Sequence, residues 1–318
     1  MRARNFFARG VSLNATQETN RLSRPGRPLP PKRSDAACGS GRPGRDTFRW
    51  QHGFTLVELV VVIAISGIIA AVLSVLLSGP INAYHDQAKR SALVAAADAA
   101  LRRMADDIRH ALPNSIRVAG GGTALQMINV LDGARYRDDV PGDQNRRLRF
   151  NNTDTRFNLL GSFTQLGDFS RNDLRLVIFN LGQPGADAYA GDAVITPAGL
   201  TITAAADSGG GALADEQNIT LSAGHQFAFQ SAGQRIYLVD NAISYICTGG
   251  QLNRRVDAIG NPQPTSGGEP QTKFVSNCAF TYSAGTASRG GLVTLDLTLT
   301  RDGESVRLLH QVHVANVP

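Results

Sequence analysis

The sequence has few of the residue patterns that carry catalysis. No serine lies in a G-x-S-x-G elbow, and neither a catalytic Cys/His arrangement nor a pair of catalytic carboxylates is apparent. Two glycine clusters, residues 120–122 and 209–211, are followed by no Lys-Ser/Thr and no helix start, which argues against a phosphate-binding loop. The sequence offers no positive case for an enzyme.

A clear metal-binding pattern is also lacking. His310 and His313 lie three residues apart, and on a strand that spacing places them on opposite sides. Asp138, Asp139 and Asp143 lack the ordered spacing of a calcium loop, so a solvated loop is expected, with calcium binding as the alternative. We therefore expect neither a metal nor a cofactor.

Basic charge is scarce outside the N-terminal tail. Of the 32 Lys and Arg residues, 11 lie in residues 1–53 with three of the 26 acidic residues, which leaves 21 basic and 23 acidic residues after Gly53. The tail lacks the interleaved aromatics of a single-strand-binding platform, so no nucleic-acid partner is expected. A basic stretch ahead of an apolar segment instead holds an N-terminus on the cytoplasmic side of a membrane. Because the tail is rich in Arg, Pro, Gly and Ser without apolar periodicity, residues 1–53 should be a disordered leader.

Long apolar runs are limited to one clear case. Residues 54–79 contain a single charge, that of Glu58. As a helix they would extend over roughly 39 Å, more than a hydrocarbon core of about 30 Å. A cleaved secretory signal is a poor match, because its apolar region is normally only about 7–15 residues long. We expect residues 54–79 to be the transmembrane half of a long helix.

The helix should continue beyond the membrane. Gly79 and Pro80 are expected to bend it without ending it. Residues 80–112 have amphipathic spacing, and Pro113 should stop the helix after Leu112. The apolar stripe consists of Leu93, Ala97, Leu101, Met104 or Ala105, Ile108 and Leu112, and the charged residues Arg102, Arg103, Asp106, Asp107 and Arg109 are expected on the other side.

The remainder, residues 113–318, looks β-rich. Residues 174–179 and 234–239 are short strand candidates, and loops rich in Gly, Ala and Pro are expected at residues 203–214 and 259–271. The clearest pattern predicts a C-terminal hairpin with one buried face, which turns at residues 301–304. Its alternating apolar residues are Val293, Leu295, Leu297 and Leu299, then Val306, Leu308, Val312 and Val314. The expected fold class is α+β, with a long N-terminal helix docked on a β-rich head.

The chain has three cysteines, an odd number that usually leaves one thiol over. If the chain is cut after Gly53, Cys38 leaves with the tail, and Cys247 and Cys278 remain. In a head exported to an oxidising compartment this pair is a disulfide candidate. Two unconnected buried thiols are the alternative.

Gly53, Phe54 and Glu58 meet three chemical requirements together. A processing protease needs a small residue at its cut, and Gly53 supplies it. Cleavage would create a charged amine on Phe54, and Glu58 lies four residues on, inside the apolar stretch, where an unpaired carboxylate is costly. If Glu58 of an incoming subunit paired with the Phe54 amine of a neighbour, assembly would gain an electrostatic register. A chance acid in an ordinary anchor, or a pair with its own amine one turn away, is the alternative.

The stretch GFTLVELVVVIAISGIIA, residues 53–70, resembles the N-terminal signature of the type IV pilin superfamily. The resemblance implies that a prepilin peptidase cuts between Gly53 and Phe54 and methylates the Phe54 amine. It also implies assembly roles for Phe54, Thr55 and Glu58, and a helix packed in a filament with other pilins on an inner-membrane assembly platform. The leader departs from the family pattern, in which it is usually far shorter.

Further stretches are similar to the O-type minor pilin-like proteins of the mannose-sensitive haemagglutinin (MSHA) pilus biogenesis set. The junction between helix and head also resembles the J-type minor pseudopilin of type II secretion. These resemblances favour a Cys247–Cys278 bridge in a β-rich head. The stretches are residues 105–118, 237–240, 243–247, 278–282 and 308–318.

Three functions follow as hypotheses. The first is a minor pilin or pseudopilin held in the inner membrane by lipid contacts, with its head in the periplasm, before it enters a filament. The second is a surface-binding module, an adhesin or DNA-uptake receptor, with the loop at residues 259–271 as its contact surface. The third is a membrane-anchored hydrolase, for which the sequence offers least.

Overall fold

The structure is a computed structural model that describes residues 53–139, 146–164, 171, 173–207, 215–260, 262–285, 290–314 and 316. Apart from Gly53, the expected leader lies outside the described residues, as do Asp143 and the glycines at 209–211. The chain divides into two compact units, Met1–Ile63 and Ala64–Pro318.

Helix α1, Leu56–Arg109, continues through Pro80. Residues 56–63 belong to the first unit and the rest of the helix to the second. The long helix expected from the sequence is confirmed, although it begins at Leu56 and not at Phe54. Because no break occurs at Pro80, the bend expected at Gly79 and Pro80 stays a prediction.

The C-terminal end of α1 at Arg109 corrects the prediction that the helix reaches Leu112. His110 and Leu112 pair with strand β2, Ala124–Arg135, instead of continuing the helical turn. The N–H of Leu112 donates to the carbonyl of Ile128 at 2.9 Å, and the carbonyl of His110 accepts from Val130 at 2.9 Å. The apolar spacing continued to Leu112 because this side chain is buried, not because it is helical.

The stripe predicted on the second half of α1 is confirmed as a docking face. Its side chains are at most 4% exposed and join one core with residues of two sheets. Burial of such a stripe supplies most of the stability of a helix in a protein. The buried residues are Leu93, Ala97, Leu101, Met104, Ala105 and Ile108.

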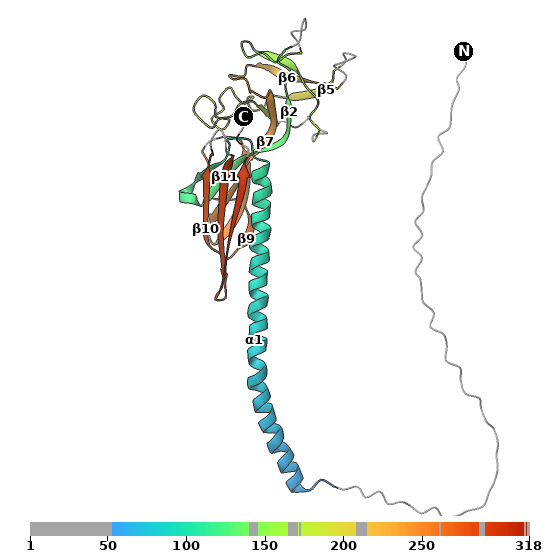
Figure 1. Ribbon diagram of the computed structural model, residues 1–318, viewed down its shortest axis with the longest axis vertical. Coiled ribbons are helices and arrows are strands. Elements are labelled where there is room, and N and C mark those ends of the chain that lie inside the picture. The colour runs from blue at the N-terminus through green and yellow to red at the C-terminus, as the bar shows by residue number, and fades with distance from the viewer. Residues whose placement is uncertain are drawn as a thin grey trace, which may run out of the picture. The chain divides into compact units, whose positions relative to one another are not determined.

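The main sheet has six strands in the order β1-β2-β7-β8-β9, with β4 also paired to β7. Every pairing in it is antiparallel. Figure 1 shows β9, β10 and β11 alongside the C-terminal part of α1. The strands other than β2 are β1 (Arg117–Ala119), β4 (Arg175–Val177), β7 (Arg235–Thr248), β8 (Gln251–Ala258) and β9 (Glu269–Lys273), and the short 3-10 helix η1 (Gly120–Gly122) separates β1 from β2.

A second sheet consists of β10 (Val275–Ser283), β11 (Gly291–Arg301) and β12 (Glu304–Val314). The C-terminal hairpin predicted from the sequence is confirmed, since β11 and β12 pair antiparallel from Gly291 to Arg301. All four alternating apolar residues of β11 are buried, as are Val306, Val312 and Val314 of β12. The hairpin therefore presents one apolar face to the core that contains α1.

A third sheet interrupts the hairpin formed by β2 and β7. These two strands pair as far as Arg135 opposite Arg235, and the chain between them includes the sheet β3-β6-β5. This sheet packs in a second apolar core together with Leu176 of β4 and Ile236 and Leu238 of β7. In Figure 1, β5 and β6 lie beyond the C-terminal end of α1. The strands are β3 (Asp154–Leu159), β5 (Ile202–Ala206) and β6 (Gln217–His225).

Two predicted loops and two predicted strands need correction. Strand β5 occupies residues 202–206, so the expected loop from 203 is wrong at its start, and residues 208–214 lie outside the described part of the chain. Strand β9 begins at Glu269, inside the loop expected at 259–271. The strand expected at 174–179 shortens to Arg175–Val177, and that at 234–239 extends to Thr248. Pairing partners decided each of these limits, and local composition does not reveal them.

Candidate functional site

The N-terminal motif begins α1 and is open to its surroundings. The side chain of Phe54 is 80% exposed, and nothing lies within 4 Å of the position a Cβ would take at Gly53. Glu58, in the first turn, is exposed and makes no ion pair with any residue the structure describes. The expected cleavage between Gly53 and Phe54, the methylation and the assembly role of Glu58 stay predictions, which this accessible geometry permits.

Thr55 has a local role that the sequence reasoning missed. Its hydroxyl Oγ1 accepts a hydrogen bond from the backbone N–H of Glu58 at 3.2 Å, which makes it the N-cap of α1. The sequence contains a pattern that predicts this N-cap, because Thr55 and Glu58 have the T-x-x-E spacing of a capping box. The assembly role that the family resemblance implies for Thr55 stays a prediction.

The first part of α1 is apolar and uncovered. The stretch Leu56–Leu77 is long and apolar enough to cross a membrane, and every residue in it is exposed. The side chains of Leu56, Val57 and Val75 are 78%, 69% and 79% exposed. A helix that is apolar all round needs lipid or other protein to cover it. This part of α1 can therefore act as a membrane anchor.

The second part of α1 is tied to the main sheet through Asp107. Its Oδ2 accepts hydrogen bonds from the Tyr245 hydroxyl at 2.6 Å and from Nε of Arg254 at 2.9 Å. The prediction that Asp107 lies on the outer side of the helix with Asp106 is wrong, since the Asp107 side chain is only 20% exposed. Two polar partners on β7 and β8 explain why a charged residue faces the sheet.

The electrostatics of this junction follow from burial and from Asp107. Burial, reinforced by the adjacent Asp107 carboxylate, raises the pKa of the Tyr245 hydroxyl well above its usual range. Burial by itself would lower the pKa of Arg254, but the hydrogen bond and charge of Asp107 raise it overall. Tyr245 therefore stays a neutral donor and Arg254 a cation.

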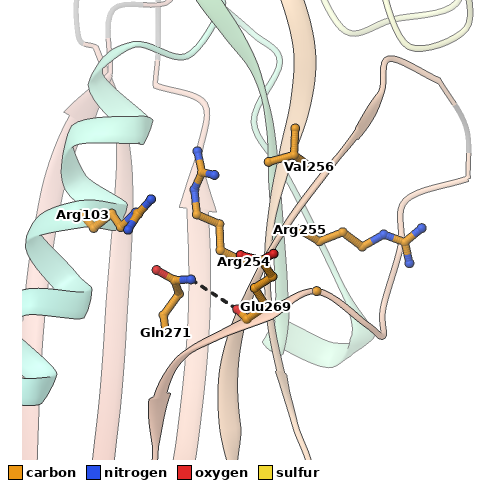
Figure 2. A pocket seen from close by; sticks show the side chains of 7 residues that line it. Arg103, Arg254, Arg255, Val256, Glu269 and Gln271 are labelled. Atoms are coloured by element: carbon orange, nitrogen blue, oxygen red, sulfur yellow. Dashed lines mark hydrogen bonds between the residues drawn. The ribbon is translucent and has the colours of Figure 1, made fainter.

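A cavity of about 320 Å³ lies next to this junction. Arg103 of α1 and Arg254 of β8 extend toward it from facing elements, and the amide of Gln271 donates to the backbone carbonyl of Glu269 at 3.2 Å (Figure 2). Arg255 points away and binds Asp257 through Nε at 2.7 Å. The lining residues, which include Val256 and Gly268, contain no serine, cysteine or histidine that could act as a nucleophile or base.

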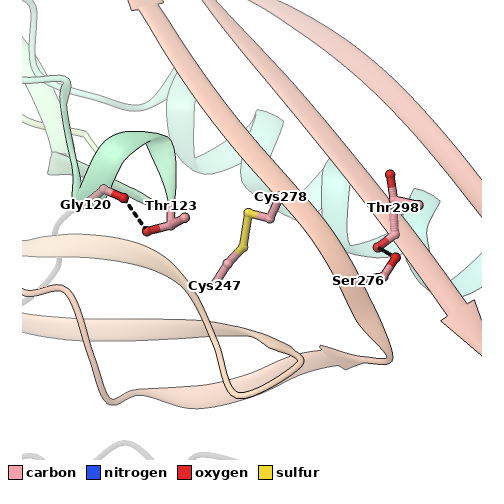
Figure 3. Close-up of a disulfide and its surroundings, with 6 residues drawn as sticks. All are labelled: Gly120, Thr123, Cys247, Ser276, Cys278 and Thr298. Atoms are coloured by element: carbon pink, nitrogen blue, oxygen red, sulfur yellow. Dashed lines mark hydrogen bonds between the residues drawn. A yellow bond between two sulfur atoms is a disulfide. The ribbon is translucent and has the colours of Figure 1, made fainter.

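Cys247 of β7 and Cys278 of β10 form a disulfide (Figure 3). It therefore joins the main sheet to the C-terminal sheet, the two sheets that share a core with α1. The N–H of Cys247 also donates to the carbonyl of Thr123 at 2.9 Å, so the turn that follows η1 is fixed beside the bridge.

The two histidines considered as metal ligands do not face each other. His310 is half-buried and His313 is exposed, on opposite faces of β12, as the strand spacing predicts. No group of three or more His, Cys, Asp or Glu residues that could hold a metal occurs in the described parts of the chain.

Comparison with known proteins gives one match, at the N-terminal motif. Residues 51–74 match the family model of the prokaryotic N-terminal methylation motif. No curated protein and no solved structure matches the chain significantly. The chain thus carries a type IV pilin-like prepilin signal on an apolar helix typical of a membrane-anchored pilin, followed by a β-rich head.

Proposed function

We propose that the chain is a minor pilin-like subunit, cut between Gly53 and Phe54 by a prepilin peptidase and carried into a type IV pilus by α1. The main support is the coincidence of the methylation motif, residues 51–74, with the uncovered start of α1. In the membrane, lipid covers the apolar stretch Leu56–Leu77 of α1. In a filament, the corresponding helices of other subunits cover it.

The assembly chemistry rests on three residues. Cleavage gives Phe54 a positively charged amine, which the peptidase then methylates. Glu58 carries a carboxylate at the same end of the helix, and in a lipid environment each charge needs a partner. Pairing of Glu58 in an incoming subunit with the Phe54 amine of its neighbour fixes their axial register, while Thr55 keeps the first turn helical.

The more specific proposal is a role in biogenesis of an MSHA-type pilus, with a minor pseudopilin of type II secretion as the alternative. The stretches that resemble these families include the helix end at residues 105–118 and both cysteine-containing strands. A strain lacking the gene should lose pili if the first assignment is right. If it keeps pili and fails to export enzymes, the second is right.

The proposed location before assembly is the inner membrane, with the head in the periplasm. The Cys247–Cys278 disulfide supports an oxidising compartment for the head, because such bonds are rare in the cytosol. The basic residues ahead of the apolar helix support a cytoplasmic N-terminus.

A surface-binding role is the second candidate, favoured by the extra sheet inserted between β2 and β7. This β3-β6-β5 sheet packs in the second core, together with residues of β4 and β7, and contributes no residue to the core that holds α1. A deletion within the loop at residues 259–268 tests the contact surface expected from the sequence. Loss of adhesion or DNA uptake with unchanged filament number would favour this role.

Mass spectrometry of filament-associated protein tests the main proposal. The expected N-terminal peptide begins with N-methylated Phe54. A Gly53→Leu variant should accumulate uncut in the membrane, because a bulky side chain replaces the small residue at the cut, whereas Gly53→Ala should still be processed. Assembled filaments whose subunits keep residues before Phe54 would overturn the proposal.

A further inference from the structure

The cavity of about 320 Å³ beside the helix–head junction has the size of a small-ligand site. Ligand pockets generally measure about 300–1,000 Å³, so this one suits only a small molecule. Its walls come from the docked half of α1, which carries Arg103, from β8, which carries Arg254, and from β9, which carries Gln271 (Figure 2). A ligand can reach it from solvent, because the lining residues Val256 and Glu269 are exposed.

Two guanidinium groups bring positive charge to this cavity from facing elements. The side chains of Arg103 and Arg254 both extend toward it (Figure 2). Asp107 binds Nε of Arg254 at 2.9 Å, so this guanidinium is held in place before any ligand arrives. Arg103 is exposed and makes no ion pair with any residue that the structure describes. Because a guanidinium binds a carboxylate through two parallel hydrogen bonds, these arginines favour a carboxylate as the ligand group.

The β9 side of the cavity carries groups that bind hydroxyls. The amide of Gln271 donates to the backbone carbonyl of Glu269 at 3.2 Å, which leaves its Oε1 as an acceptor. The Glu269 carboxylate, which has no ion pair in the described part of the chain, is a second acceptor. Its negative charge disfavours a ligand that carries several charges, whereas hydroxyl groups can donate to it. The lining therefore suits a single carboxylate accompanied by hydroxyl groups.

Gly268 keeps the start of β9 close to β8. Its φ is 99°, and a Cβ at this position would lie 2.9 Å from the backbone carbonyl oxygen of Arg254. A larger residue would therefore displace the chain and move the adjacent Glu269 away from the cavity. This wall belongs to the end of the loop at residues 259–271, the contact surface expected from the sequence.

We propose that this cavity binds an acidic monosaccharide, such as the uronic acid unit of a polysaccharide. Arg103 and Arg254 hold the carboxylate. Glu269 and Gln271 accept hydrogen bonds from the hydroxyl groups, and the exposed side chain of Val256 contacts a C–H face of the ring. The inference rests on the surface-binding role, the second candidate function, and needs neither prepilin cleavage nor filament assembly, so it can fail separately from the main proposal.

Saturation-transfer NMR of the full chain in phosphatidylcholine nanodiscs tests this inference, with glucuronate as the probe. Glucose is the matched control, because a CH₂OH group replaces the carboxylate on the same ring. Glucuronate should bind about tenfold more tightly than glucose, as expected for hydrogen bonds to a charged group. Acetate and inorganic phosphate should bind more weakly than glucuronate, since neither combines a single carboxylate with hydroxyl groups.

Two neighbouring arginines of α1 supply the matched variants. Arg103→Gln removes a cation of the cavity and should weaken glucuronate binding about tenfold without changing the weak binding of glucose. Arg102→Gln makes the same charge change one residue away, where Arg102 pairs with Asp98 and does not line the cavity, and should leave binding unchanged. Both arginines are exposed, so neither variant should unfold the head. Arg103→Lys keeps the charge but lacks the forked donor, and should restore only part of the affinity.

Equal binding of glucuronate and glucose would overturn the proposal, as would phosphate or acetate binding as tightly as glucuronate. Equal losses in Arg102→Gln and Arg103→Gln would also overturn it, because only the general charge of the helix would then matter. If no sugar binds and Arg103→Gln instead reduces filament number, the cavity is a contact between subunits and the proposal is wrong. If the natural protein binds no glucuronate but deletion of residues 259–268 still abolishes adhesion, the surface-binding role stands and this ligand is rejected.

Discussion

Asp107 of α1 accepts hydrogen bonds from both Tyr245 and Arg254, at 2.6 and 2.9 Å, and so binds the helix to two adjacent strands of the main sheet. These contacts lie beside the apolar stripe that includes Met104 and Ile108, both 0% exposed. The apolar stripe holds the helix against the sheets, and Asp107 adds a directional contact that opposes rotation about the helix axis.

Removing the Asp107 charge should therefore destabilise the helix–head junction. Asp107→Asn weakens the bond to Arg254 and leaves a half-buried cation poorly paired, at a cost of about 1–3 kcal/mol. Asp106→Asn is the matched control, because Asp106 makes only an exposed pair with Arg109 and its loss should cost less than about 0.5 kcal/mol. Chemical denaturation of the two variants gives the comparison, and equal stability would show that the Asp107 contacts contribute nothing.

The Cys247–Cys278 bridge should contribute substantially to stability. The cysteines lie 31 residues apart, and closing a loop of that size in the unfolded chain is worth about 3.5 kcal/mol in the chain-entropy model. A variant with both cysteines changed to serine should lose that much free energy of unfolding. A reducing agent should destabilise the natural protein similarly and leave the double variant unchanged, and a natural protein insensitive to reduction would contradict the bridge.

The C-terminal hairpin offers a comparison of one residue type on its two faces. Leu297 on β11 is 1% exposed, and truncation to Ala should cost about 2–5 kcal/mol through lost burial and a cavity. Leu309 on the facing strand is 58% exposed, and the same truncation should cost less than about 0.5 kcal/mol. Thermal unfolding distinguishes them. Similar losses at both sites would mean that the outer face of the hairpin is also covered.

The inserted sheet should be acid-sensitive through Glu216. Burial opposes ionisation of its carboxylate, but hydrogen bonds from Arg137 and Asn158 and the Arg137 charge lower its pKa overall, below the usual 4.5. Since the folded state binds this proton less readily than the unfolded state, its contribution is present above pH 4.5 and is lost as the pH falls below it.

Glu216→Gln removes the titrating group and should cost about 1–3 kcal/mol at neutral pH, because Arg137 loses its partner. The variant should also show a shallower loss of stability between neutral pH and acid than the natural protein. Asp215→Asn, at the neighbouring exposed position, provides the control. Parallel pH profiles for the natural protein and Glu216→Gln would exclude this ion pair as the source of acid sensitivity.

Glu58→Val should leave membrane insertion intact and reduce assembly. The substitution makes the first turn of α1 more apolar, so insertion loses nothing, but the Phe54 amine of the neighbouring subunit loses its proposed partner. Leu59→Val, at the next exposed position, should assemble normally. Counting filaments and fractionating membranes measures both effects, and normal piliation of Glu58→Val would refute the pairing.

The sequence by itself determined the elements whose patterns are local. An uninterrupted apolar run predicts the start of α1 whatever surrounds it, and the stripe from Leu93 to Ile108 predicts its docked half. The alternation from Val293 to Leu299 predicts a strand with one buried face in the same way. The processing motif around Gly53 and Phe54 could also be predicted from the sequence, because the residues that define it are neighbours in the chain.

Only the tertiary structure decided the features that depend on partners distant in sequence. Helix α1 ends at Arg109 because the N–H of Leu112 donates to the carbonyl of Ile128 in β2. Asp107 faces the main sheet because its carboxylate accepts hydrogen bonds from Tyr245 and Arg254. Hydrogen bonds and ion pairs between distant segments carry no periodic signal, so they emerge only when the chain is folded.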